Sequence, residues 1–275
     1  MRNTMTNPMV TLSESTLALD EWVANAIVDV KRTPGQLEAR WQLVKLYCLQ
    51  ADWDRAMRQL DTLLKIEPEC QRQVDLYRNL ILSERLRTAV LVGEREAVTV
   101  EGALPEWAAQ LVQSNALYAN ADYAQGEKMR QLALENASAL QGQSESLGQF
   151  EWLADSDDRL GPVCEFICAG GYRWIPFSSL DSLHVSAPKG LNDLVWAPAT
   201  ARVNGQNWLG YIPARYPVTL DDDQKVKAGL ETHWIEQGAR FIGAGRKMWL
   251  SNVGECSLFE AGAIEANTAD EEQSA

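Results

Sequence analysis

The sequence has few cysteines and histidines, and it lacks the patterns in which these residues bind metals or form disulfides. Its five cysteines are odd in number and include no Cys-x-x-Cys pair: Cys48, Cys70, Cys164, Cys168 and Cys256. A disulfide framework is therefore not expected. With only two histidines in the chain, a zinc site of four ligands would need partners from distant segments. We expect neither a metal nor a cofactor.

Long apolar runs and an excess of positive charge are missing as well. No apolar run reaches the roughly 18 residues of a membrane-spanning helix, and the N-terminal segment MRNTMTNPMV lacks the apolar centre of a signal peptide. Aspartate and glutamate number 38 against 25 lysines and arginines, which gives a formal net charge of −13. Nucleic acids and anionic membrane surfaces bind basic faces. We therefore expect a soluble, cytoplasmic protein that binds neither nucleic acid nor membranes.

Common catalytic motifs are also absent. The chain contains no Gly-x-Ser-x-Gly nucleophile motif and no glycine-rich phosphate loop that opens a helix. Residues 151–162, EWLADSDDRLGP, concentrate carboxylates that could form an acid–base pair or a metal site, but their spacing does not match an EF-hand loop. The simpler interpretation, which we favour, is a loop in which one aspartate caps a following helix and Arg159 pairs with a neighbour.

Two segments of the chain nearly repeat each other. Residues 51–60 read ADWDRAMRQL, and residues 121–132 read ADYAQGEKMRQL. In the first copy Asp52 is placed to cap a helix, apolar residues follow at spacings of three and four, and Pro68 ends the helix. Pro34 lies 34 residues before Pro68, and this is the period of tetratricopeptide-like helical hairpins. Because one hairpin cannot bury its apolar face alone, we expect similar hairpins to stack.

The remaining pattern of the first half agrees with helical hairpins joined by a longer helix. A hairpin over 37–68 is followed by one helix over 70–92, which Gly93 ends. A connector then leads to Pro105, which opens the next helix. The unit over 107–139 contains the second copy of the repeat.

One face of the helix over 37–49 is a candidate for binding a partner. Leu43, Val44 and Tyr47 are expected to face the second helix of the hairpin. The opposite face lines a concave groove in tetratricopeptide-like arrays, where a peptide or helix can bind. The candidate partner-binding residues on that face are Glu38, Trp41, Lys45, Cys48 and Leu49. The alternative is that Trp41 packs against the preceding hairpin.

The composition changes after the polar stretch 141–149. Twelve of the 18 glycines and six of the ten tryptophans follow residue 149, and short apolar runs between turn residues predict an antiparallel, curled sheet. Two helices are expected beside it. The first begins at Pro162, places Cys164 and Cys168 on one face as buried thiols, and ends at the glycine pair 170–171. The second and weaker one covers 221–237.

The chain is therefore expected to have an α+β fold in two parts. An N-terminal, all-α tetratricopeptide-like domain precedes a mainly antiparallel β domain that is rich in tryptophan. The expected boundaries are a disordered N-terminus over 1–12, the helical domain over 13–142, the second domain over 150–263 and a disordered acidic tail over 264–275.

The order of four motifs resembles the ImpE family, also called SciE-type or TagJ. The motifs are QADWDRAMRQLDTLLKIEP, FEWLADSDDRLGPVCEFICAGGYRWIPF, DLVWAPA and IPARYP. The chain departs from the family where RYPVTL replaces the frequent RYPGS, and at Cys164 and Cys168, where members mostly carry ordinary hydrophobic residues. The residues that carry the resemblance, and that we expect to be structural, are Glu151, Trp152, Asp155, Asp158, Arg159, Gly161, Pro162, Trp174, Pro176, Trp196, Arg215, Tyr216 and Pro217.

The resemblance implies a non-enzymatic accessory role in bacterial type VI secretion, a virulence-associated system. It further implies binding of the N-terminal helix of the small contractile-sheath subunit, and a link to the ClpV ATPase that disassembles the sheath. An acidic protein with a helical groove agrees with this role. The alternative, from another functional class, is an enzyme or carbohydrate-binding protein that uses the loop over 151–162 and the tryptophan-rich sheet.

Overall fold

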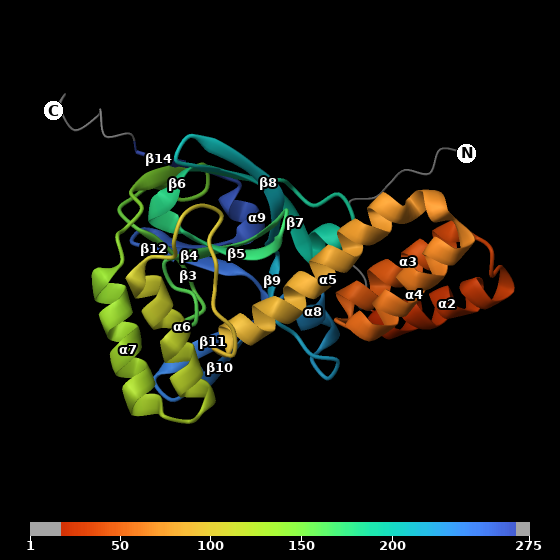
Figure 1. The fold of residues 1–275 in the computed structure, drawn as a ribbon, viewed down its shortest axis with the longest axis horizontal. Helices are drawn as coiled ribbons and strands as arrows, with labels where there is room; N and C mark the ends of the chain where they lie inside the picture. Colours follow the sequence, from red (N-terminus) through yellow and green to blue (C-terminus); the bar gives the residue numbers. More distant parts are fainter. Residues whose placement is uncertain (1–17, 268–275) are drawn as a thin grey trace.

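The computed structural model describes residues 18–267 and confirms the α+β fold (Figure 1). The expected disordered segment over 1–12 and most of the expected acidic tail lie outside the described residues. The helices of the first half are α2 (Leu19–Arg32), α3 (Leu37–Leu49), α4 (Trp53–Ile66), η1 (Pro68–Cys70), α5 (Gln71–Leu91), α6 (Glu106–Ala119) and α7 (Tyr123–Asn136). The hairpin over 37–68, the long helix that follows and the second hairpin are therefore confirmed.

The repeated Ala-Asp-aromatic segment has the same local structure in both copies. Ala51 and Ala121 adopt positive φ angles of 59° and 61° at the turn between two helices, a conformation that glycine adopts more readily. The next residue caps the second helix of each hairpin. Asp52 accepts a hydrogen bond from the backbone N–H of Arg55, and Asp122 accepts one from Gln125. The repeat is thus a shared turn and cap.

The second half forms one large sheet and two small ones. The large sheet has the strand order β2-β1-β14-β6-β7-β8-β4-β5, and the small sheets have the orders β10-β11-β9 and β13-β12-β3. Every strand pairing is antiparallel. The strands are β1 (Gly142–Ser144), β2 (Gly148–Phe150), β3 (Leu153–Asp155), β4 (Val163–Cys168), β5 (Gly171–Pro176), β6 (Leu180–Val185), β7 (Trp196–Val203), β8 (Gln206–Pro213), β9 (Arg215–Tyr216), β10 (Thr232–Gln237), β11 (Arg240–Arg246), β12 (Met248–Ser251), β13 (Gly254–Ser257) and β14 (Ala263–Ala266).

Two helix predictions in the second half are wrong. The segment that begins at Pro162 forms strand β4, whose six residues are all buried. Because both faces of β4 are covered, its sequence shows no alternation and reads like a buried helix. Over 221–237 only the short helix α8 (Gln224–Lys227) forms, and β10 follows it. Cys164 and Cys168 still share one face, since residues four apart in a strand point the same way, and both are buried in the core as expected.

The expected boundaries also differ from the observed elements. The polar stretch 141–149 contributes strands β1 and β2 instead of a linker, and β14 extends past residue 263 to Ala266. These segments pair with each other, since Gly142 of β1 lies opposite Ala266. A backbone hydrogen bond needs no particular side chain, and this explains why polar residues at the two ends of the domain gave no strand signal.

The halves share a continuous apolar core. One buried cluster contains side chains of α2 to α6 together with residues of the sheet region, among them Trp174 and Trp196. The ring of Trp196 lies 5.9 Å from that of Trp53 in α4 and 6.4 Å from that of Tyr77 in α5. A second cluster lies wholly within the sheet region and its preceding segment. The helices therefore pack on the second half as part of one core.

The two caps can be tested as a pair. Asp52→Ala and Asp122→Ala should each lower the free energy of unfolding by about 1 kcal/mol, because each leaves a first-turn N–H without its acceptor. Urea denaturation followed by circular dichroism measures this loss. Asp52→Asn and Asp122→Asn are the matched controls, since asparagine also caps helices. Equal loss in the asparagine variants would contradict the capping role.

Candidate functional site

The expected partner-binding face of α3 is partly closed by the second half of the chain. The guanidinium of Arg215 donates hydrogen bonds to the backbone carbonyls of Leu49, at 2.6 Å, and Cys48, at 2.8 Å. Cys48 and Leu49 are each 0% exposed. Cys48 and Leu49 therefore cannot contact a partner in this structure, which corrects the expectation of an open face of five residues. The reason is that both side chains belong to the apolar core.

The rest of that face remains at the surface. Glu38 is exposed, and Trp41 and Lys45 are half-buried. The ring of Trp41 lies 5.3 Å from that of Tyr77, so it has an aromatic neighbour in α5. Glu38, Trp41 and Lys45 are three and four residues apart and form a stripe along one side of α3.

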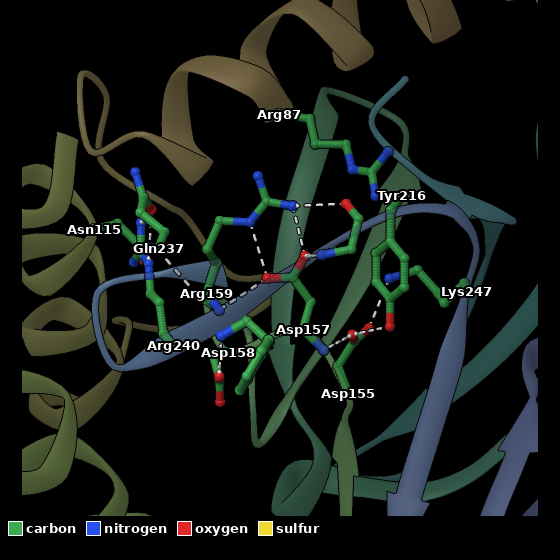
Figure 2. Close-up of polar contacts among 12 residues, drawn as sticks. Arg87, Asn115, Asp155, Asp157, Asp158, Arg159, Tyr216, Gln237, Arg240 and Lys247 are labelled. Atoms are coloured by element: carbon green, nitrogen blue, oxygen red, sulfur yellow. Dashed lines mark hydrogen bonds and ion pairs between the residues drawn. The ribbon is translucent and has the colours of Figure 1, made fainter. Parts of the chain in front are cut away.

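The loop over 151–162, which we call the acidic loop, has carboxylates that are part of a buried ion network (Figure 2). Lys247 Nζ lies 2.6 Å from Asp155 Oδ2 and 2.8 Å from Glu165 Oε2. The guanidinium of Arg87, from α5, donates to both oxygens of Glu165 at 2.7 Å. We call the set Arg87, Glu165, Lys247 and Asp155 the ion chain. It links α5 to β3, β4 and the junction between β11 and β12, where Lys247 lies.

Further groups complete the hydrogen bonding of the ion chain. Tyr172 donates its hydroxyl proton to Glu165, and Trp196 Nε1 donates to Glu84, which also pairs with Arg87. Burial alone would raise the pKa of Glu165, but the charges of Arg87 and Lys247 outweigh it and hold that pKa well below its usual range. Burial raises the pKa of Asp155 despite the opposing charge of Lys247.

The neighbouring carboxylates hold the β10–β11 hairpin. Asp157 accepts from Arg159 Nη2 at 2.5 Å and from the backbone N–H of Gly243 at 2.8 Å. Asp158 accepts from Arg130 of α7 and from the N–H of Phe241. The predicted pairing of Arg159 with a neighbour is confirmed, whereas the predicted aspartate cap is wrong because a strand follows the loop.

A groove opens beside this loop. Its volume is about 350 Å³, and its wall includes Arg130 and Leu134 of α7, together with Trp152, Asp155 and Asp158. Trp152 is 36% exposed. Both oxygens of Asp155 and of Asp158 accept hydrogen bonds from the protein itself. The carboxylates next to the groove therefore bind donors of the chain itself and help to hold the fold together.

Most of the motif residues have identifiable structural contacts. Gly161, at a φ of 51°, accepts a hydrogen bond from the N–H of Asp155 through its carbonyl, and Pro162 accepts one from Phe177. Trp174 Nε1 donates to the Tyr172 hydroxyl. The Tyr216 hydroxyl donates to Asp155. Pro176 lies opposite Val163 in the sheet. The backbone N–H of Glu151 donates to Asn252, and Pro217 is half-buried.

Sequence reasoning missed three members of the ion chain, which are Arg87, Glu165 and Lys247. A usable signal existed for Glu165, because it interrupts the apolar run VCEFIC, and a charge inside such a run needs a buried partner. Among the described residues no group of three or more His, Cys, Asp and Glu side chains could hold a metal ion. Within the same part of the chain no helix is both long and apolar enough to span a membrane.

Comparisons with known proteins cover nearly the whole chain. The family model described as ImpE protein matches residues 148–265. The type VI secretion system accessory component TagJ of Pseudomonas aeruginosa is 33% identical over 256 residues, which are 92% of this chain and 89% of that protein. The crystal structure of protein VPA1032 from Vibrio parahaemolyticus superposes with a TM-score of 0.84 at 24% identity, over 94% of this chain and 97% of that chain. This likeness shows that the fold is shared.

The ion chain can be tested through its lysine. Lys247→Met should lower the free energy of unfolding by about 3–5 kcal/mol at pH 7.5, because it leaves the buried carboxylate of Asp155 without a cation. Without Lys247 the pKa of Asp155 rises further, so the folded state binds a proton more readily than the unfolded state. The deficit relative to the unmodified protein should therefore shrink as the pH falls to about 5.5.

Thermal unfolding at a series of pH values measures both effects. Lys225→Met is the matched control, because Lys225 forms an exposed ion pair with Glu231, and its removal should leave the unfolding midpoint almost unchanged. A deficit in the Lys247 variant that is independent of pH would contradict this account.

Proposed function

This chain belongs to the ImpE family, and from that premise we propose that it is a non-enzymatic accessory protein of a bacterial type VI secretion system. The observation that carries the proposal is the similarity to the TagJ accessory component over 92% of the chain. The use of the acidic loop as an internal support favours an adaptor over an enzyme, since the loop's carboxylates bind the chain's own donors.

The proposed partner is the N-terminal helix of the small contractile-sheath subunit. Helical hairpins commonly receive an amphipathic helix along one face. The stripe Glu38, Trp41 and Lys45 offers a carboxylate and an ammonium on either side of an aromatic ring, which fixes the direction of a bound helix through opposite charges at its two ends. The net charge of −13 favours a partner segment of basic character.

The proposed setting is the cytoplasm, where the protein would connect the sheath to the ClpV ATPase. An adaptor needs no catalytic group for this task. It needs a surface for the sheath helix and a rigid body behind it. The ion chain and the shared core supply support for such rigidity, because they hold the helices against the sheet.

Calorimetric titration with a synthetic peptide tests the proposal. The peptide is the N-terminal helix of the small sheath subunit from the same bacterium. We expect binding in the micromolar range for the full chain, and a loss of at least about 10-fold in affinity in the Trp41→Ala, Lys45→Glu variant, which removes the ring and reverses the charge. Circular dichroism checks that the variant is folded.

Trp152→Ala is the matched control, since it removes a tryptophan from the groove beside the acidic loop. It should bind the peptide as the unmodified chain does. Loss of binding in Trp152→Ala with retention in the α3 variant would move the site to that groove. No binding by any form of the protein would overturn the proposed partner.

A further inference from the structure

The β10–β11 hairpin carries an unusual amount of apolar surface at an open sheet edge. Trp234 is 42% exposed, and Ile235 and Phe241 are each 50% exposed. Within the described residues, β10 pairs with β11 and with no other strand. Figure 1 shows the hairpin next to α6, at the rim of the molecule. Proteins usually protect open edges with charges, prolines or a covering element, because an apolar edge pairs readily with another strand.

The turn of the hairpin fixes which backbone groups point outward. Gln237 lies opposite Arg240, so the loop has the two residues Gly238 and Ala239, and Gly238 has a φ of +65°. In a two-residue hairpin the closing pair exchanges both backbone hydrogen bonds, and every second pair does the same. Residues 233, 235 and 237 therefore direct their N–H and C=O groups at β11. Those of Thr232, Trp234 and Glu236 point to the open edge.

The outward-pointing backbone groups of Thr232, Trp234 and Glu236 can pair with the same strand of a second copy of the protein. Two identical antiparallel strands related by a two-fold axis keep their side chains on matching faces when one residue lies on the axis. If that residue is Trp234, it pairs with its own copy, and Thr232 pairs with Glu236 of the other chain at both ends. All three outward-pointing residues then have partners. If residue 233 or 235 lies on the two-fold axis instead, one of the three outward-pointing residues has no partner among the other chain's three.

The side chains agree with this register. No carboxylate lies opposite another carboxylate, because Glu236 faces a threonine. On one face the two Trp234 rings meet at the axis, and each is already held by Tyr216, whose ring lies 5.6 Å away. On the other face His233 lies opposite Ile235. The open edge is therefore complementary to itself in hydrogen bonding and in apolar surface, and this register brings no two like charges directly opposite each other.

We propose that this protein forms a homodimer by antiparallel pairing of β10 with β10 of a second copy, centred on Trp234. The β10-β11-β9 sheets of the two copies then join into one continuous sheet with the order β9-β11-β10-β10-β11-β9. Three hydrogen-bonded residue pairs supply about six backbone hydrogen bonds. Because each chain has a net charge of −13, long-range repulsion opposes the dimer, and added salt should screen that repulsion and strengthen association.

Sedimentation equilibrium of the full chain tests the proposal. We expect a monomer–dimer equilibrium with a dissociation constant in the micromolar range, which tightens as sodium chloride is raised. Trp234→Lys should weaken the dimer at least about 10-fold, because it places two ammonium groups opposite each other at the axis. Phe241→Lys is the matched control, since Phe241 is 50% exposed on the same hairpin but belongs to β11, and it should leave the dimer intact.

A charge-complementation experiment separates pairing from misfolding. Trp234→Lys and Trp234→Glu should each be monomeric alone, and a mixture of the two should form a heterodimer with a lysine opposite a glutamate. Three results would overturn the proposal: an unmodified protein that stays monomeric at high salt and about 300 μM, a Trp234→Lys dimer as tight as that of the unmodified protein, or a mixture that stays monomeric. The peptide titration described above is independent of all three.

Discussion

The buried ion chain of Arg87, Glu165, Lys247 and Asp155 is the constraint on which the rest of the structure depends. Removing such charges from water costs several kcal/mol for each ion, and this cost is offset only when the groups are paired and fully hydrogen-bonded. The ion chain meets that condition with cations from α5 and from the residue that precedes β12, and with carboxylates from β3 and β4. Apolar residues could pack in many arrangements, whereas these four ions have few satisfactory ones. The network thus specifies how α5 lies on the sheet.

A polar contact between distant residues also explains why the inner face of α3 differs from the open surface that the repeat pattern suggested. In an open tetratricopeptide-like array the inner face of each hairpin is available to a ligand. Here Arg215 reaches the end of α3, and burial lowers the pKa of its guanidinium to about 10 in a site where backbone carbonyls are its hydrogen-bond partners. A cation at the carboxyl end of a helix is electrostatically favourable. The end of the inner face at Cys48 and Leu49 is therefore occupied by the protein's own second half.

The features predictable from sequence were those that depend on local chemistry. Spacing of apolar residues and the Asp52 cap located the helices, because both signals act within one or two turns. Strand β4 was misassigned because it is buried on both sides, so its residues lack the alternation that identifies a half-exposed strand. The partners of Glu165 could not be found from spacing, since Arg87 lies 78 residues away and Lys247 lies 82 residues away. Closure of α3 by Arg215 was missed for the same reason. No local pattern reports on such pairs.

The separation between Arg215 and α3 also has a consequence for synthesis on the ribosome. The carbonyl of Leu49 receives its partner from a residue 166 positions later in the chain. At a translation rate of roughly 5–20 residues per second, this interval lasts on the order of ten seconds or more. During that time the emerging helices have neither Arg215 at the end of α3 nor Trp196 against Trp53 and Tyr77. The nascent helical segment therefore exposes apolar surface until β7 and β9 have been made.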